Sequence, residues 1–371
     1  MQEKRFSTEL MSKPFKSYDE YMSYIFACVN YRLSDYIEGL MKKYDAGQGN
    51  YKNVMYPDIE IAHDLCSDSI QKFFYGEDKD DNFEELLDVF DDELKGILEH
   101  FGTGEDELEE ERTDDKEEKL TVEKMFAFID ARLAVTDTSK INIPFYELCR
   151  KLELGHFTIF ALAAAILSST QTSYAAVFQV VNENGSLVAP TVESVGRMYF
   201  GEDYSITTAY SEMSVCLEKL LPIMDLRVNA NMPFSTLLAP DKRLIDYLFG
   251  KEPMRLDENY SRFFSMLTDG NELDPIMANE VQLEAMEISY QQNTRIFSWY
   301  GDEGSGRRFF IKHFCQKNQL NAIVMNCKKL FAYDYNFVEK ALWAVTRECI
   351  FTDSSCCLNE LNYREDEKDK Y

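Results

Sequence analysis

Residues 291–371 constrain the fold most strongly, because apolar runs and helical patterns alternate there over short distances. "RIFSWYG" is an apolar run that ends in glycine, and a glycine-rich turn follows it. "RRFFIKHFCQKN" and "NFVEKALWAVTREC" have helical periodicity, whereas "LNAIVMNCKKL" and "SSCCLNEL" are typical of short buried strands. The order strand, glycine-rich loop, helix, strand, helix, strand predicts the front half of an α/β domain of the P-loop type.

The glycine-rich turn "GDEGSGRR" is close to the phosphate-binding pattern G-x-x-x-x-G-K-[ST]. Gly301 and Gly306 have the spacing of the two glycines in the pattern, and Gly304 and Ser305 lie between them. In such a loop the backbone N–H groups and the N-terminus of the next helix face the phosphates. Glycine lets the backbone approach the phosphates closely, so this part of the motif is intact.

The side chains of the motif are altered. Arg307 replaces the lysine and keeps its charge, but Arg308 replaces the hydroxyl that binds Mg²⁺ and cannot bind a cation. A second motif follows the last predicted strand, where an Asp-Glu pair holds Mg²⁺ and polarises the attacking water. Here the pair is Asn359 and Glu360, so only the water-polarising carboxylate remains. We expect ATP binding with doubtful Mg²⁺ binding, and a glycine-rich turn in another α/β domain is the alternative.

Residues 1–101 are predicted to form a helical region. Ser12 and Pro14 are typical of a helix start, and apolar residues then recur at spacings of three and four as far as Tyr44. The apolar stripe of this long helix must dock on a neighbouring helix or, alternatively, on a partner subunit. Further helical pattern follows in residues 58–101.

The negative charge is concentrated in one part of the chain. Residues 77–118 hold 21 acidic and 4 basic side chains, so they carry 17 of the 27 net negative charges. Residues 102–119 have almost no apolar content and are predicted to be a disordered acidic linker, with docking of a basic partner as the alternative. Such a surface repels nucleic-acid phosphates and anionic lipids.

Residues 120–290 are predicted to form a helical domain that resembles a winged helix. "NIPFYELCRKLELGHFTIFALAAAIL" predicts two helices joined by a turn at Leu154 and Gly155. "MDLRVNANMPFSTLLAP" predicts two short strands around Asn229–Asn231, which would be the wing. Few basic residues lie in this region, which disfavours DNA binding and favours docking of a protein.

The remaining composition is that of a reduced, cytoplasmic protein. Its nine cysteines are scattered without a C-x-x-C pair. Its four histidines lie far apart, which disfavours a metal site. The longest apolar run, Phe157–Leu167, is 11 residues long, whereas a bilayer span needs about 20. We therefore expect a buried helix at this run and no membrane association.

From about Thr121 onward, roughly two-thirds of the chain resembles the AAA ATPases encoded with phage-tail-like contractile injection systems. In that group a helical, winged-helix-like region precedes an AAA module. The resemblance lies in the order and patterning of several phrases, and only residues 301–308 form a strict motif. The phrases are "IDARL…INIPFYELCRKLELGHFTIFALAAAIL", "APTVESVGRMYFG", "FSTLLAPDKRLIDYLFG", "NELDP", "YGDEGSGRRFFIKHF" and "ALWAVTRECIFTDSSCCLNEL".

The resemblance implies an ATP-binding module of the AAA class that assembles into a homo-oligomeric ring and remodels protein partners of an injection system. By position, Gly301, Gly306, Arg307 and Arg308 match its first nucleotide motif, and Asn359–Glu360 matches its second. Family members continue past this point with sensor residues, an arginine finger and a helical lid. We therefore expect a truncated module that is inactive by itself.

Two other functions compete with this interpretation. A catalytically inactive AAA-like scaffold or adaptor would keep the fold and lose turnover, as the substitutions in both motifs suggest. A winged-helix regulator that binds nucleic acid is disfavoured by the charge of the chain.

Overall fold

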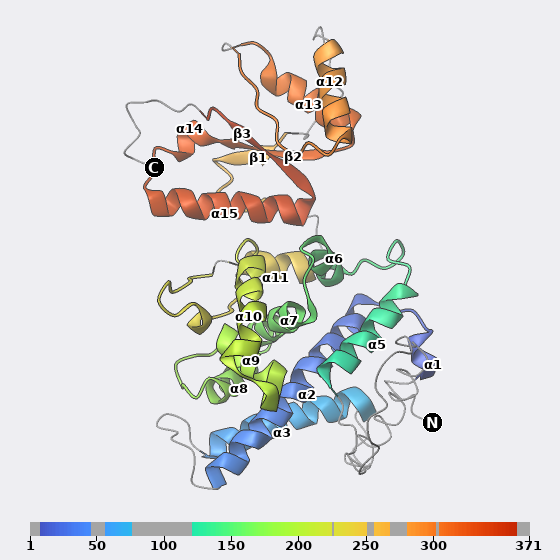
Figure 1. The fold of residues 1–371 in the computed structure, drawn as a ribbon, viewed down its shortest axis with the longest axis vertical. Helices are drawn as coiled ribbons and strands as arrows, with labels where there is room; N and C mark the ends of the chain where they lie inside the picture. Colours follow the sequence, from blue (N-terminus) through green and yellow to red (C-terminus); the bar gives the residue numbers. More distant parts are fainter. Residues whose placement is uncertain are drawn as a thin grey trace. The chain divides into compact units, whose positions relative to one another are not determined.

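The computed structural model describes residues 8–45, 56–75, 121–224, 226–250, 256–267, 280–301 and 304–361. The chain divides into two compact units, Met1–Leu248 and Phe249–Tyr371. The described residues are mostly helical and contain one three-stranded sheet (Figure 1). This confirms the prediction of a mostly α chain. The predicted acidic linker, 102–119, and the predicted helical pattern in residues 76–101 lie outside the described residues.

The first unit is built from α-helices and two short 3₁₀ helices. The α-helices are α1 (Thr8–Met11), α2 (Tyr18–Asp45), α3 (Tyr56–Tyr75), α5 (Val122–Ala134), α6 (Pro144–Lys151), α7 (His156–Thr170), α8 (Tyr174–Val181), α9 (Val192–Phe200), α10 (Ile206–Leu220) and α11 (Lys242–Phe249). The 3₁₀ helices are η1 (Gly201–Asp203) and η2 (Pro233–Ser235). None of the described helices is long and apolar enough to cross a membrane.

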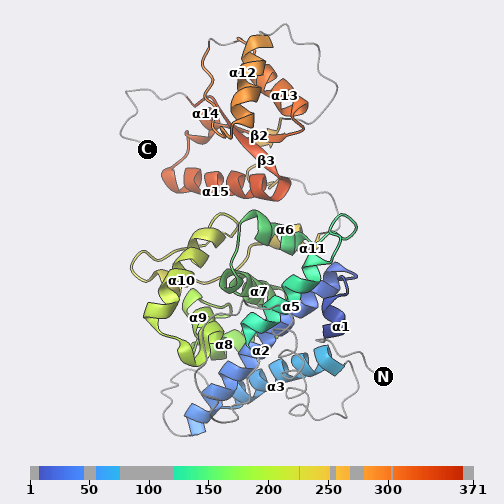
Figure 2. The same ribbon diagram turned by 45° about the vertical axis from the view of Figure 1, so that its right-hand side comes forward.

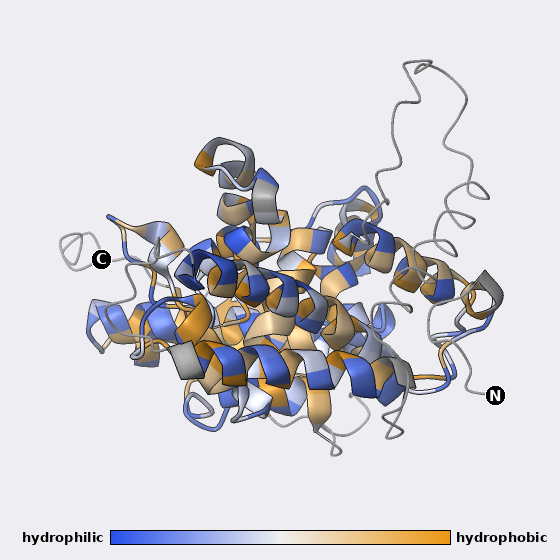
Figure 3. Cartoon of the chain, turned by 90° about the horizontal axis from the view of Figure 1, so that it is seen from below, coloured by the Kyte–Doolittle hydropathy of each residue, from blue (hydrophilic) through white to orange (hydrophobic). Residues whose placement is uncertain are grey.

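Helix α2 is the long amphipathic helix that the sequence predicts. Its buried face packs against α3, α5, α7, α8 and α9. The apolar stripe therefore docks on neighbouring helices of the same chain. Hydrophobic and hydrophilic residues alternate along the helices of this unit, as expected where one face of each helix is buried (Figure 3).

These contacts also place α2 and α3 in one unit with α5–α10. The sequence predicts separate regions at residues 1–101 and 120–290, whereas the described parts of residues 1–101 and of 120–248 share one core. Tyr24, for example, stacks on Phe128 of α5 with ring centroids 5.8 Å apart.

Helix α7 is the centre of this core. Its residues from Phe160 to Leu167 are all buried, in agreement with the apolar run in the sequence. It contacts α2, α8, α9 and α10. A helix that is apolar on every side needs such neighbours.

The predicted wing strands are not formed. Residues 226–240 contain η2 and a single isolated β-bridge between Thr191 and Leu237. The N–H of Val192 donates to Thr236 O at 3.2 Å, and the N–H of Leu238 donates to Pro190 O at 2.8 Å. Local bonds compete with strand pairing here, because Asn229 Oδ1 accepts from the N–H of Asn231 at 3.0 Å. The prediction of two strands was therefore wrong.

The second unit contains the sheet. Its strands are β1 (Phe264–Met266), β2 (Asn321–Asn326) and β3 (Ser354–Asn359), in the order β1-β2-β3. Its helices are α12 (Glu280–Gln291), α13 (Arg307–Lys317), α14 (Cys327–Leu330) and α15 (Tyr335–Thr352). Strand β1 pairs antiparallel with β2, and β2 pairs parallel with β3. Helices α12 and α13 lie on one face of the sheet and α15 on the other (Figures 1 and 2).

Helices α13 and α15 and strands β2 and β3 agree with the sequence. Helix α14, which lies within the predicted β run "LNAIVMNCKKL", and the first predicted strand do not. Residues 294–300, which include most of "RIFSWYG", have no regular structure. Ile296 and Tyr300 are 87% and 91% exposed, so this run lacks the burial that would stabilise a strand. The sheet instead takes its third strand from β1, upstream of residue 290. Residues 249–290 therefore fall in the second unit, whereas the sequence analysis placed them with residues 120–248.

Candidate functional site

The candidate site lies at the edge of the sheet where β2 and β3 end. These strands are parallel, and their last residues, Asn326 and Asn359, are directly opposite each other. Helix α13 ends three residues before β2 begins, so the start of α13 returns toward the edge where β2 ends. Figure 1 shows the start of α13 on the side of the sheet that carries α14. In open α/β sheets this edge is where ligands bind.

The glycine-rich loop folds back on itself. A Cβ atom added to Gly301 would lie 2.9 Å from the Oγ atom of Ser305, so the two ends of the loop approach each other closely. Gly304 has φ 83° and Gly306 has φ 77°, both in the left-handed region that favours glycine. The loop therefore uses its glycines for backbone conformation. Residues 302 and 303 lie outside the described part of the loop.

The loop leads directly into α13. Gly306 is the N-cap of α13 and offers no side chain to the first turn. The first helical bond runs from the N–H of Phe310 to Gly306 O at 2.9 Å. The N–H groups of the residues before Phe310 have no partner within the helix, as at every helix N-terminus, and an anion can accept from them.

Positive charge is concentrated around this loop. Residues 304–331 contain six lysine or arginine residues and no aspartate or glutamate, in a chain with a net charge of −27. Arg307 and Arg308 begin α13 and are exposed. Lys328 and Lys329 follow the end of β2. A strongly negative chain with one such segment favours an anionic ligand there.

Arg308 is coupled electrostatically to β3. Burial raises the pKa of the Cys357 thiol, the neighbouring Cys356 raises it further, and Arg308 lowers it. Cys357 lies two residues before Asn359 on the same strand. The structure thus brings the first and second sequence motifs to neighbouring parts of the same edge.

The second motif has the expected place and an unexpected backbone conformation. Asn359 ends β3 and is half-buried, and Glu360 follows it and is exposed. Glu360 has φ 57°, a left-handed conformation that is uncommon for a residue with a side chain. The carboxylate of Glu360 contributes to the raised pKa of Cys327, whose main cause is burial. Glu360 is therefore close to the end of β2 as well.

The residues at this edge suit an anion better than a metal ion. Arg308 and Asn359 stand at the two positions where a P-loop ATPase supplies a hydroxyl and a carboxylate to Mg²⁺. Among the described residues, no group of three or more His, Cys, Asp or Glu side chains could hold a metal ion. The exposed Arg307 and the N–H groups in the first turn of α13 can donate to an anion.

Sequence reasoning missed Asn326 and the two lysines after it. The Asn326 side chain accepts from the N–H of Lys329 at 2.9 Å and caps α14. The dipeptide Lys328–Lys329 directly after an apolar strand was a usable signal. Its proximity to Asn359 depends on the parallel register of β2 and β3, which the sequence does not reveal.

Comparisons of the chain with protein-family models, with curated proteins and with solved structures find no match.

Proposed function

We propose that the second unit is part of a nucleotide-binding module of the AAA type, and that its glycine-rich loop binds the phosphates of ATP. The observation that supports this most is the path of the loop. Gly304 and Gly306 have positive φ, and the loop passes directly into the N-terminus of α13, at the carboxyl edge of two parallel strands. This combination presents backbone N–H groups to a phosphate.

Arg307 and Arg308 supply the charge in this proposal. A lysine would place a compact charge on the phosphates, whereas arginine presents a planar fork that can bind two phosphate oxygens together. Two adjacent guanidinium groups partly replace the charge of a metal ion. Binding is therefore expected without Mg²⁺, with Asn359 as a weak metal ligand at most.

Glu360 is the proposed water-polarising residue, by its place after β3. Hydrolysis needs charge stabilisation opposite the leaving phosphate, which other AAA proteins receive from an arginine finger. We expect no turnover by this chain alone. The first unit would dock protein partners of a contractile injection system, and the protein would assemble as a homo-oligomer.

A scaffold or adaptor that keeps the fold without turnover is the second candidate. Two features favour the scaffold: Glu360 has a left-handed conformation, and Asn359 stands where the motif has an aspartate. A scaffold of this kind could still bind a nucleotide. Turnover by the assembled oligomer separates the two functions, because only the ATPase would release phosphate.

The test is a calorimetric titration of the chain with ATP, with and without Mg²⁺. We expect binding of similar affinity in both cases. Gly306→Val should abolish binding because valine is disfavoured at φ 77°, and Arg307→Ala should weaken it about tenfold or more. Lys317→Ala is the matched control, because it removes one positive charge from the opposite end of the same helix. Binding that is unaffected by both loop variants would reject the site, and duplex DNA binding would favour the regulator instead.

A further inference from the structure

Five of the nine cysteines lie in the second unit and surround β3. All nine are free thiols. The five are Cys315 on α13, Cys327 on α14, Cys349 on α15, and Cys356 and Cys357 on β3. This gathering has no role in the nucleotide site proposed above.

The two cysteines of β3 face opposite sides of the sheet. Cys356 pairs with Ile323 and Cys357 with Val324, and paired residues on neighbouring strands point to the same face. Ile323 belongs to the core that includes Ala341 and Val345 of α15. Val324 belongs to the separate core that includes residues of α13. Cys356 therefore faces α15, and Cys357 faces α13.

Cys349 lies on the same face of the sheet as Cys356. It is in the last turn of α15 and packs against the core that contains Ile323. The N–H of Asp353 donates to Cys349 O at the end of the helix, and the hydroxyls of Thr352 and Ser354 are 2.7 Å apart. This short turn returns the chain into β3. The Cys349 and Cys356 thiols are close enough to shift each other's pKa.

The contact between the two thiols shifts their pKa values in opposite directions. It lowers the pKa of Cys356 and raises the pKa of Cys349, which burial raises further. Cys356 is also exposed, whereas Cys349 is half-buried and Cys327 is fully buried. An exposed cysteine of lowered pKa with an adjacent thiol is the usual arrangement of a reactive cysteine and its resolving partner.

We propose that Cys349 and Cys356 form a reversible disulfide that joins the end of α15 to β3. The oxidant is a low-molecular-weight disulfide such as oxidised glutathione. The Cys356 thiolate attacks one sulfur of the oxidant, giving a mixed disulfide and releasing one thiolate. Cys349 then loses its proton to water and attacks the Cys356 sulfur, which releases the second thiolate. Two protein thiols are oxidised and one small disulfide is reduced to two thiols.

The disulfide would fix β3 to α15 across the short turn at Asp353. Asn359 and Glu360 follow Cys356 on the same strand, so oxidation would stiffen the second motif. The disulfide itself rests only on the position of the two thiols. It stands or falls independently of ATP binding.

The experiment exposes the folded, reduced chain to oxidised glutathione, alkylates the remaining thiols and maps the products by mass spectrometry. Wild type should lose two of its nine alkylatable thiols. Proteolytic cleavage before Asp353 separates Cys349 from Cys356, so the two fragments should remain linked until a reductant is added. Cys349→Ser should stop at a glutathione adduct on Cys356.

Cys357→Ser is the matched control, because it alters the neighbouring thiol on the opposite face of β3. It should form the linked fragments as wild type does, and Cys356→Ser should not. A link that disappears in Cys357→Ser, or a wild-type chain in which Cys356 stays fully alkylatable, would overturn the proposal. A glutathione adduct on wild-type Cys356 that never resolves would also overturn it.

Discussion

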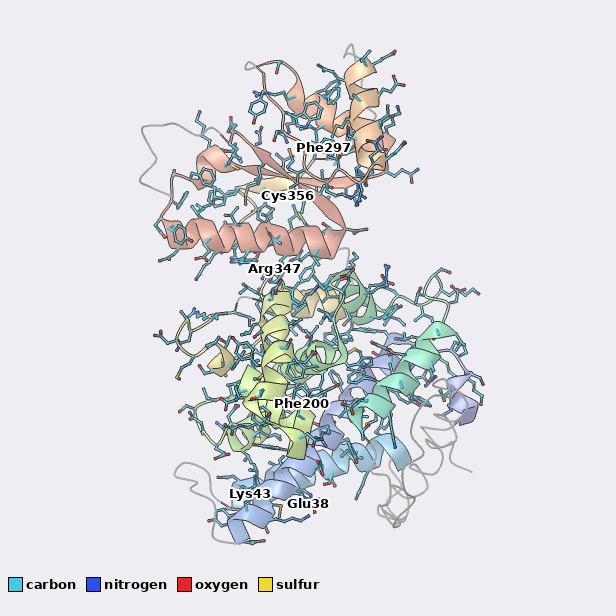
Figure 4. The ribbon with its side chains drawn as sticks, in the orientation of Figure 1. Glu38, Lys43, Phe200, Phe297, Arg347 and Cys356 are labelled. Carbon is cyan, nitrogen blue, oxygen red and sulfur yellow. The ribbon has the colours of Figure 1, made fainter. Side chains whose placement is uncertain are left out.

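The Nη2 atom of Arg347 donates to Oδ2 of Asp257 at 2.8 Å, and both side chains are only 8% exposed. Arg347 is on α15 (Figure 4), and Asp257 lies 90 residues earlier, in the segment that leads to β1. The other oxygen of Asp257 accepts from the N–H of Asn259 at 3.0 Å. The ion pair therefore attaches the segment before β1 to α15, the helix that covers the face of the sheet opposite α13.

Asp257→Ala should lower the free energy of unfolding of the second unit by about 3–5 kcal/mol. Removing one partner of a buried ion pair takes away the opposite charge that faces the other, and that loss exceeds the net value of the pair. Urea unfolding followed by circular dichroism measures it. Lys317→Ala, which removes an exposed member of the 2.7 Å pair with Glu287, is the control in the same unit. A loss no larger than that of the control would contradict the prediction.

Much of this unit could be predicted from local pattern. The periodicity of "NFVEKALWAVTREC" and the apolar run at Ala322–Met325 gave α15 and β2 correctly, because both elements bury one face or both. The three-residue strand β1 has no such pattern and exists only through its pairing with β2. Residues 295–300 are as apolar as a strand, but Phe297 and Trp299 pack against the core beside α13 while Ile296 and Tyr300 are exposed. Composition does not reveal whether a partner strand is present.

The site could be predicted only in part. Spacing identified Gly301 and Gly306, since the glycine positions of the loop are a property of local sequence. The approach of Arg308 to β3 and the pairing of Asn326 with Asn359 are products of strand order and register. These arise from contacts between residues more than 30 positions apart, which a single sequence does not encode in any local pattern.

Arg132 is a second buried charge, in the first unit. Its side chain is 1% exposed and donates to Glu20 Oε1 at 2.8 Å and to Lys13 O at 3.1 Å. The guanidinium also lies 4.1 Å from the ring centroid of Phe15 and 5.0 Å from that of Tyr24. One planar cation thus joins the start of α2 to α5 through both hydrogen bonds and ring contacts.

Arg132→Ala should destabilise the first unit by about 2–4 kcal/mol, because it leaves a cavity and removes the partner of Glu20. Arg132→Lys should restore less than half of this loss, since a compact ammonium cannot stack on Phe15 and reach the same acceptors. Thermal unfolding measures both variants. Lys42→Ala, in an exposed pair with Glu38, should leave the stability unchanged. Full rescue by lysine would show that charge alone matters at this position.

Gly306 should resist replacement because of its backbone conformation. At φ 77° an alanine pays about 1–2 kcal/mol for the left-handed conformation, although its Cβ would meet no atom within 4 Å. Gly306→Ala should therefore lower the stability of the second unit by about that amount without a steric clash. Gly155→Ala is the control, because Gly155 also has open space around it but has φ −75°. Equal effects on chemical unfolding would show that Gly306 is not held in this conformation.

Tyr174 should make the first unit sensitive to alkaline pH. Its hydroxyl donates to Asn30 Oδ1 at 2.6 Å, and the Ser69 hydroxyl is 3.2 Å away. Burial raises the pKa of Tyr174 from 10.0 to about 12. The folded state thus keeps the phenol proton at a pH where the unfolded state loses it. The contribution to stability is fully present below about pH 10 and is lost as the pH rises through about 12.

Two pKa units correspond to about 3 kcal/mol, so urea unfolding should show a fall of this order between about pH 9 and about pH 12. Other buried tyrosines and thiols titrate in the same range, and Tyr174→Phe isolates the contribution of this residue.

The variant should be about 1–3 kcal/mol less stable at neutral pH, because it leaves Asn30 without its buried donor. Its stability should then fall less steeply with pH than that of wild type. Tyr210→Phe, at a residue that is 58% exposed, should follow the wild-type slope. If the stability of Tyr174→Phe falls with pH as steeply as that of wild type, the prediction is wrong. Tyr174 would then ionise in the folded chain at the pH where free tyrosine titrates, and the hydrogen bond to Asn30 would not hold its proton.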